Sequence, residues 1–170
     1  HDAEGAVTKS LTNWPGNVTS FSARKAETFE IEHLRVALHG RSFADRRAEG
    51  DFIDSYPARR EGWLNIGILH TSLEGHPDHD PYAPCSQARL TSCGYDYWAL
   101  GHIHERRIVS QAPWIVYPGN LQGRSVKECG PKGAVRVSVS DGQIAGVEPL
   151  TLDVARWAHP KIDISACQTE

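Results

Sequence analysis

Short apolar runs, each ended by polar or turn-forming residues, dominate the hydrophobic pattern of the chain. Thr28 to Leu38 alternates in part and predicts two extended pieces. Two later runs, Leu64 to Leu69 and Tyr97 to Leu100, have the length and continuity of buried strands. The first run ends at His70 and the second at Gly101-His102-Ile103-His104.

Helices are predicted only in short segments. Residues 4 to 12 favour a helix ended by Asn13, and a second short helix is predicted from Ser86 to Gly94. Residues 40 to 62 combine Gly, Pro, Asp and arginine pairs and predict a loop with one helical turn.

The last third of the chain is predicted to be all β. A strand at Trp114 to Tyr117 stops at Pro118-Gly119-Asn120, and an alternating strand at Ala134 to Val139 meets a hairpin turn at Asp141-Gly142. The extended segments that follow are Gln143 to Val147 and Leu150 to Val154. The hydrophobic pattern weakens after Thr151, where we expect the chain to leave the folded domain. Helices and strands together predict an α/β fold.

The composition fits a folded protein without a membrane segment. Hydrophobic residues make up 39% of the 170 residues, which excludes a disordered chain and supports one domain with its own core. No apolar run approaches the roughly 18 residues of a membrane helix, and no signal peptide opens the chain. The chain begins at His1 and contains no Met, so we expect that an upstream segment is missing. Four cysteines without a C-x-x-C pair favour reduced thiols in a cytoplasmic protein, with a disulfide as the less favoured alternative.

The net charge limits how this chain could bind nucleic acid. A formal charge of −3 gives the chain no general basic field, so we do not expect this segment alone to bind DNA tightly without sequence preference. A nucleic-acid enzyme remains compatible with this charge, because metal ions can make the contact with phosphate.

Histidines at the ends of the predicted strands are the strongest candidates for chemistry. His70, His102 and His104 follow the two buried runs, and ligands bind at the carboxyl ends of strands in open α/β sheets. Imidazole is the commonest metal-ligating side chain, and a His-x-His spacing puts both rings on one face of an extended segment. A single histidine here would more often cap a strand. Three in this arrangement favour a metal site, so we expect them to converge on one pocket.

Other polar groups are weaker candidates. His1-Asp2 pairs an imidazole with a carboxylate that can fix its tautomer and raise its basicity. The run His76-Pro77-Asp78-His79-Asp80 has the composition of a metal cluster, but its proline and the preceding Gly75 favour a solvated loop. His39 is predicted to be a structural strand-end residue. Motifs of phosphate-binding glycine loops, zincin helices and nucleophile elbows are absent.

Three motifs, in chain order, resemble the later motifs of the calcineurin-like metallophosphoesterases. They are His1-Asp2, Ile68-Leu69-His70-Thr71 and Gly101-His102-Ile103-His104. Three further stretches are most similar to the DNA-repair exonuclease branch, the SbcD-like nuclease subunits. They are Tyr82-Ala83-Pro84-Cys85, the lead-in Gly94-Tyr95-Asp96-Tyr97-Trp98-Ala99-Leu100, and the loop Pro118-Gly119-Asn120-Leu121-Gln122-Gly123-Arg124. The likeness extends from residue 1 to about residue 157.

The resemblance implies an α/β fold that is the C-terminal portion of a metallophosphoesterase β-sandwich flanked by helices (αββα). Residues 1–150 would form the C-terminal part of the nuclease core, and residues 151–170 the start of a following cap segment. It also implies two divalent metal ions, usually manganese, with His70 and His102 ligating one ion and His104 the other. His1 would stabilise or protonate the leaving oxygen, and Asp2 would orient His1.

The function implied by the resemblance is metal-dependent phosphodiester hydrolysis on DNA, by an exonuclease or endonuclease of DNA repair. Its implied partners are DNA and an SMC-like ATPase subunit, its location is the cytoplasm, and no membrane is involved. The family's earlier motifs, an Asp-x-His pair and a bridging Asp, are absent from the chain. We therefore expect this fragment alone to bind metal poorly and to be inactive. Two alternatives stay open: a phosphomonoesterase or small-molecule phosphodiesterase of the same superfamily, and a non-catalytic scaffold that binds a partner.

Overall fold

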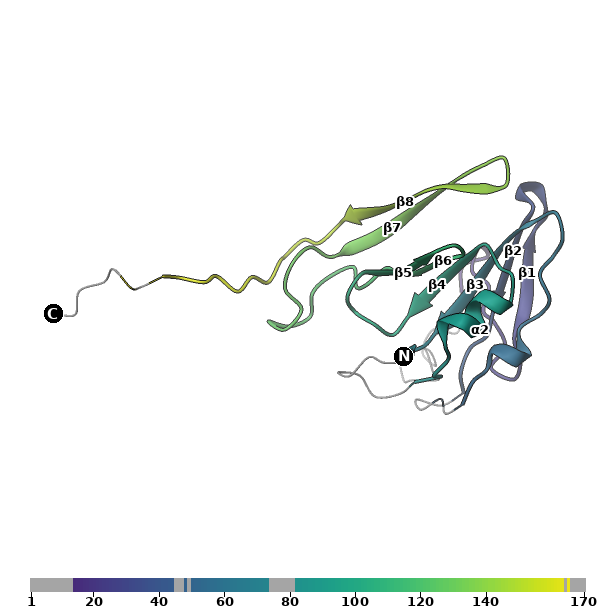
Figure 1. Ribbon diagram of the computed structural model, residues 1–170, viewed down its shortest axis with the longest axis horizontal. Helices are drawn as coiled ribbons and strands as arrows, with labels where there is room; N and C mark the ends of the chain where they lie inside the picture. Colours follow the sequence, from purple (N-terminus) through teal and green to yellow (C-terminus); the bar gives the residue numbers. More distant parts are fainter. Residues whose placement is uncertain (1–13, 45–47, 49, 74–81, 164, 166–170) are drawn as a thin grey trace.

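The computed structural model describes residues 14–44, 48, 50–73, 82–163 and 165. A six-stranded sheet has the order β1-β2-β3-β4-β6-β5, and β7 and β8 form a separate two-stranded ribbon (Figure 1). The strands are β1 (Glu27–Ile31), β2 (Val36–Gly40), β3 (Leu64–His70), β4 (Tyr97–Gly101), β5 (Arg107–Gln111), β6 (Trp114–Tyr117), β7 (Gly133–Ser140) and β8 (Gln143–Thr151). The helical elements of the described residues are η1 (Glu32–Leu34), η2 (Ile53–Ser55) and α2 (Gln87–Ser92). The predicted α/β class is confirmed; the predicted helix at residues 4 to 12 lies outside the described residues.

The centre of the large sheet is parallel and its two edges are antiparallel. β2 pairs with β3, β3 with β4, and β4 with β6 in parallel, whereas β1 and β5 run antiparallel to their neighbours. The carboxyl ends of the four parallel strands therefore meet at one edge of the sheet. In sheets of this kind, that edge is where ligands bind.

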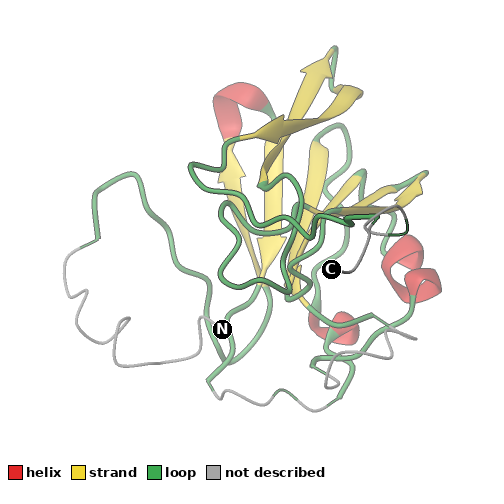
Figure 2. Ribbon diagram, turned by 90° about the vertical axis from the view of Figure 1, so that its left-hand side faces the viewer, coloured by secondary structure: helices red, strands yellow, loops and turns green. Residues whose placement is uncertain are grey.

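Helix α2 connects β3 to β4 and lies beside the sheet in both views (Figure 1, Figure 2). Ser86 caps its first turn, because the serine hydroxyl oxygen accepts a hydrogen bond from the Arg89 N–H at 3.2 Å. Gly94 follows the helix with a φ of 69°, a backbone conformation that glycine adopts without steric cost. The helix turns the buried Leu90 inward. Both predicted ends of this helix are thus confirmed.

Trp98 is the centre of the core between the sheet and α2. Its side chain is fully buried, and its Nε1 donates a hydrogen bond to the Leu90 carbonyl at 3.1 Å. Tyr95 stacks on the indole with ring centroids 5.1 Å apart, and Tyr56 contacts it at 5.3 Å. Gly67, the residue opposite Trp98 in the register of β3 and β4, has no side chain and so leaves room for the indole.

His39 is a buried structural histidine in β2. Its Nδ1 lies 2.8 Å from the Thr28 hydroxyl, and its Nε2 lies 3.0 Å from Asn65 Oδ1. The amide nitrogen of Asn65 donates to the carbonyls of Arg60 and Trp63, so Oδ1 is the acceptor and His39 carries its proton on Nε2. Burial lowers the pKa of His39. The predicted structural role is confirmed.

The ribbon of β7 and β8 ends the regular structure. The two extended segments predicted after Gly142 form one strand, in which Pro149 lies opposite Val135. After Thr151 the described chain has no regular secondary structure and extends away from the sheets (Figure 1). A hydrogen bond from Gly130 N–H to the Trp157 carbonyl, 3.1 Å long, holds the start of this segment against the preceding loop. A separate cap segment over residues 151–170 stays a prediction.

Cys93 and Cys129 are free thiols, and Cys167 lies outside the described residues. Among the described residues, no helix has the length and apolar character needed to cross a lipid bilayer.

Candidate metal centre

His70 and His102 lie at neighbouring strand ends. His70 is the last residue of β3, and it is paired in register with Gly101, the last residue of β4. His102 follows immediately. Because β3 and β4 are parallel, both histidines reach the same edge of the sheet. The sequence prediction that these two side chains come together is confirmed.

Gly101 makes this close approach possible. A Cβ atom at this position would lie 2.8 Å from Nδ1 of His70, so any side chain here would displace the His70 ring. His102 has a φ of 96°, a left-handed conformation that costs a non-glycine residue about 1–3 kcal/mol. The chain thus turns sharply between β4 and His102, and this turn directs the second imidazole back toward the first.

The two imidazoles and Tyr82 form a three-ring cluster. The ring centroids of His70 and His102 are 5.2 Å apart in an edge-to-face arrangement. Tyr82 contacts His70 edge-on at 5.1 Å and stacks on His102 at 5.4 Å. The Nε2 atoms of both histidines are buried, whereas each residue as a whole is half-buried.

The spacing of the two rings fits two ligands of one divalent ion. An imidazole nitrogen binds such an ion at about 2.0–2.1 Å, which puts two ring centres on one ion about 4.6–5.4 Å apart for tetrahedral or octahedral angles. The observed 5.2 Å lies within this range. Within the described ranges, however, no three His, Cys, Asp or Glu side chains come together in a group that could hold a metal. This part of the chain therefore supplies two ligands and not a complete site.

Buried hydrogen bonds hold the segment that follows His70 in place. The Thr71 hydroxyl donates to the Ala83 carbonyl at 2.8 Å, and the Thr71 N–H donates to the Gly101 carbonyl at 3.2 Å. Tyr117 on β6 donates its hydroxyl proton to the Thr71 carbonyl at 2.9 Å. The segment that follows β3 is thereby tied both to the end of β4 and to the segment that carries Tyr82.

His104 has a carboxylate partner of its own. Its Nδ1 lies 2.8 Å from Oε1 of Glu128, whose other oxygen accepts hydrogen bonds from the Arg124 N–H and from the side-chain amide of Asn120. These donors, the Arg124 N–H first and then His104, lower the pKa of Glu128 to about 2, so the carboxyl is ionised at neutral pH. No other ligand joins His104 within the described part of the chain. The expectation that all three histidines converge on one pocket is therefore wrong for the described structure, which pairs His70 with His102 and pairs His104 with Glu128.

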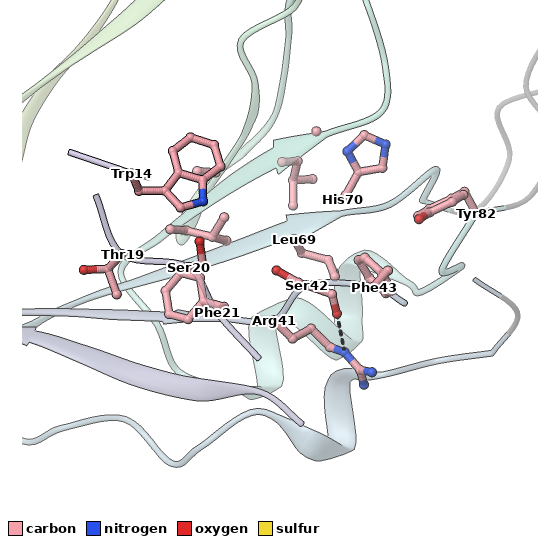
Figure 3. Close-up of a pocket in the computed structure, with 14 residues that line it drawn as sticks. Trp14, Thr19, Ser20, Phe21, Arg41, Ser42, Phe43, Leu69, His70 and Tyr82 are labelled. Atoms are coloured by element: carbon pink, nitrogen blue, oxygen red, sulfur yellow. Dashed lines mark hydrogen bonds between the residues drawn. The ribbon is translucent and has the colours of Figure 1, made fainter. Parts of the chain in front are cut away.

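A cavity of about 520 Å³ opens beside His70 (Figure 3). Its lining includes the aromatic rings of Trp14, Phe21, Phe43 and Tyr82. Arg41 also lines the cavity, but its guanidinium group stacks on the Phe52 ring at 4.2 Å and donates a hydrogen bond to the Ala23 carbonyl at 3.0 Å. The space next to His70 can therefore take an aromatic group.

Two predicted site residues, His1 and Asp2, lie outside the described residues, as does the predicted solvated loop from His76 to Asp80. Glu128 and Tyr82 were not predicted as site residues. Tyr82 belongs to a motif of the resemblance, which could have pointed to it. Glu128 lies in a polar loop where neither periodicity nor spacing relates it to His104.

The chain is similar in sequence to a protein named as a metallophosphoesterase. The chain is 38% identical over 156 residues to the Bacillus subtilis (strain 168) protein named "Uncharacterized metallophosphoesterase YhaO". The match covers 89% of this chain and 38% of the relative, so the chain spans well under half of the relative's length. No model of a known protein family matches the chain. The similarity supports the metallophosphoesterase superfamily, and the mixed six-stranded sheet is compatible with its α/β fold.

Proposed function

We propose that the protein containing this chain is a phosphoester hydrolase that uses divalent metal ions, and that its substrate is DNA. The observation that carries this proposal is the half-buried His70–His102 pair at neighbouring parallel strand ends, in a chain that is 38% identical to a protein named as a metallophosphoesterase. The chemistry of the class fits this pair, since imidazole nitrogens bind divalent transition-metal ions such as zinc and iron.

In this proposal, His70 and His102 hold one ion and His104 contributes to a second. Divalent ions activate water for attack and stabilise negative charge on the phosphoryl oxygens. The chain's own residues prepare the site: Gly101 leaves room for the His70 ring, and Tyr82 packs against both imidazoles.

The proton for the leaving oxygen is assigned to His1, with Asp2 as its orienting partner. A carboxylate paired with an imidazole favours the protonated ring that a general acid needs. This assignment rests on the sequence resemblance.

The cavity beside His70 favours a substrate that carries a base. Trp14, Phe21 and Phe43 line it with aromatic rings on which a base can stack. The sequence resemblance to the DNA-repair exonuclease branch favours DNA over a nucleotide monoester. A partner ATPase of the SMC type is proposed from the resemblance alone.

The test measures bound manganese and hydrolysis on the same variants of the full-length protein. His102→Gln should lose both bound Mn²⁺ and cleavage of linear DNA, because it removes one of two ligands to the same ion. His159→Gln is the matched control, since His159 is exposed and lies in the segment beyond β8. We expect this control to behave as wild type.

The substrates in this assay are linear DNA, a nucleotide monoester and an artificial phosphodiester. Cleavage of the monoester in preference to DNA would favour the phosphomonoesterase alternative. A His102→Gln variant that keeps its manganese and its DNA cleavage would contradict the proposal, and a wild-type protein with neither property would favour a scaffold role.

A further inference from the structure

The carboxylate of Glu128 joins two loops at the edge of the large sheet. It accepts a hydrogen bond from His104 Nδ1 at 2.8 Å on one oxygen. On its other oxygen it accepts the Arg124 N–H at 2.8 Å and the Asn120 amide at 3.3 Å. The Glu128 side chain is 18% exposed and that of His104 is 40% exposed, so the bond between them is partly buried. The loop after β6 is thereby fastened to the segment after β4.

This arrangement determines which nitrogen of His104 carries the proton. An ionised carboxylate only accepts hydrogen bonds, so the hydrogen of the His104–Glu128 bond resides on Nδ1. In the neutral ring, Nε2 then keeps its lone pair, which is available to a ligand. His39 provides the contrast within the same chain, because its Asn65 partner requires the proton on Nε2. Two histidines of one molecule are thus held in opposite tautomers by their partners.

We propose that Glu128 is the positioning residue of His104: it fixes the Nδ1–H tautomer and orients the ring so that Nε2 binds a divalent cation. A carboxylate behind a metal-binding histidine also raises the basicity of that histidine, and its loss typically weakens metal binding about 10–100-fold. The identity of the ligand rests on the proposed function, whereas the tautomer follows from the hydrogen bonds alone.

The Glu128→Gln substitution reverses this arrangement. Glutamine has one acceptor oxygen, and two donors, the Arg124 N–H and the Asn120 amide, already point at one side of the group. With the oxygen kept there, the glutamine NH₂ faces His104 and must donate to Nδ1. His104 would then carry its proton on Nε2, and the lone pair that a cation needs would be lost.

The experiment is ¹⁵N NMR of the histidine rings in the full-length protein without added metal, at a pH where both rings are neutral. Ring-nitrogen chemical shifts distinguish protonated from unprotonated nitrogens, so they report the tautomer directly. We expect Nδ1–H at His104 in the wild type and Nε2–H in Glu128→Gln, with His39 unchanged in both. The unchanged His39 signal shows that the sheet of the variant is folded. Glu148→Gln, an exposed glutamate on β8, is the matched control and should leave His104 as in the wild type.

Titration of the same proteins with MnCl₂, followed by calorimetry, tests the consequence. Glu128→Gln should bind Mn²⁺ about 10–100-fold more weakly than the wild type, and Glu148→Gln should bind it equally well. An Nε2–H tautomer at wild-type His104, or a Glu128→Gln variant with unchanged tautomer or unchanged Mn²⁺ affinity, would overturn the proposal. A wild type with the Nδ1–H tautomer that binds no Mn²⁺ would instead overturn the proposed function, and with it the cation assigned to Nε2, while the positioning of His104 by Glu128 would stand.

Discussion

Replacing Gly67 by alanine should perturb the packing of β3 against Trp98, three residues before His70 in the same strand. A Cβ atom at this position would lie 2.7 Å from Cδ2 of the Trp98 indole and closer still to Cε3 and Cζ3. The indole cannot easily move aside, because it is fully buried, stacked on Tyr95 and hydrogen-bonded to the Leu90 carbonyl. The added methyl group must therefore distort the sheet or displace the core.

The size of the effect follows from these contacts. Overpacking a rigid core costs about 1–3 kcal/mol, and loss of the indole hydrogen bond adds roughly 1 kcal/mol. We expect Gly67→Ala to lower the free energy of unfolding by about 2–4 kcal/mol. With a denaturant dependence of roughly 2 kcal/mol per molar urea, the unfolding midpoint falls by about 1–2 M.

Urea unfolding followed by tryptophan fluorescence measures this change. Gly146→Ala is the matched control, because the nearest atom to its Cβ would be Oε1 of Glu148 at 4.0 Å. An alanine in an open strand position should leave stability unchanged or raise it by about 0.5–1 kcal/mol. If Gly67→Ala falls within about 0.5 kcal/mol of wild type, the range of a neutral surface substitution, the packing argument is refuted.

Two further predictions concern the histidines. Gly101→Ala should weaken Mn²⁺ binding at least about tenfold, with a smaller loss of stability than Gly67→Ala, because a Cβ there meets only the movable ring of His70. Calorimetric titration measures the metal affinity and urea unfolding measures the stability of the same preparation. An unchanged Mn²⁺ affinity would contradict this prediction. Burial lowers the pKa of His39 below its ordinary 6.5, so the unfolded chain binds the proton more readily. Stability from the neutral ring is then fully present above about pH 6.5 and is lost as pH falls from there toward the folded-state pKa. Urea unfolding between about pH 5 and 8 should show this decline, and His39→Gln should flatten it; equal slopes for both proteins would contradict the assignment.

The sequence predicts the parallel centre of the sheet well and its margins less well. The strand at Trp114–Tyr117 is predicted with the same ends that the structure shows, because Pro118 closes a buried apolar run. The edge strand β5 is not predicted, since Arg107–Gln111 is half exposed and takes its conformation from pairing with β6. The two extended segments on either side of Pro149 are predicted separately, but the structure joins them in one strand. Each strand of a two-stranded ribbon is an edge strand, where proline is tolerated.

The candidate site, like the fold, is predicted from the sequence only in part. His70 and His102 are predictable because each follows an apolar run, and parallel pairing brings the ends of such runs together. Glu128 reaches His104 through a loop whose path depends on hydrogen bonds to Asn120 and Arg124. Such tertiary contacts have no period along the chain. The pairing of His104 with a carboxylate therefore becomes visible only in three dimensions.

The left-handed backbone of His102 has a consequence for how this protein can change over time. At a φ of 96°, glycine is the residue that the backbone itself favours, so a change of His102 to glycine would relieve strain while it removed an imidazole. Selection for stability alone and selection for ligand binding act in opposite directions at this one position. A lineage that no longer needs the ligand is free to replace His102 with glycine and become more stable. The residue found at this position in related chains therefore reports whether the site is still in use.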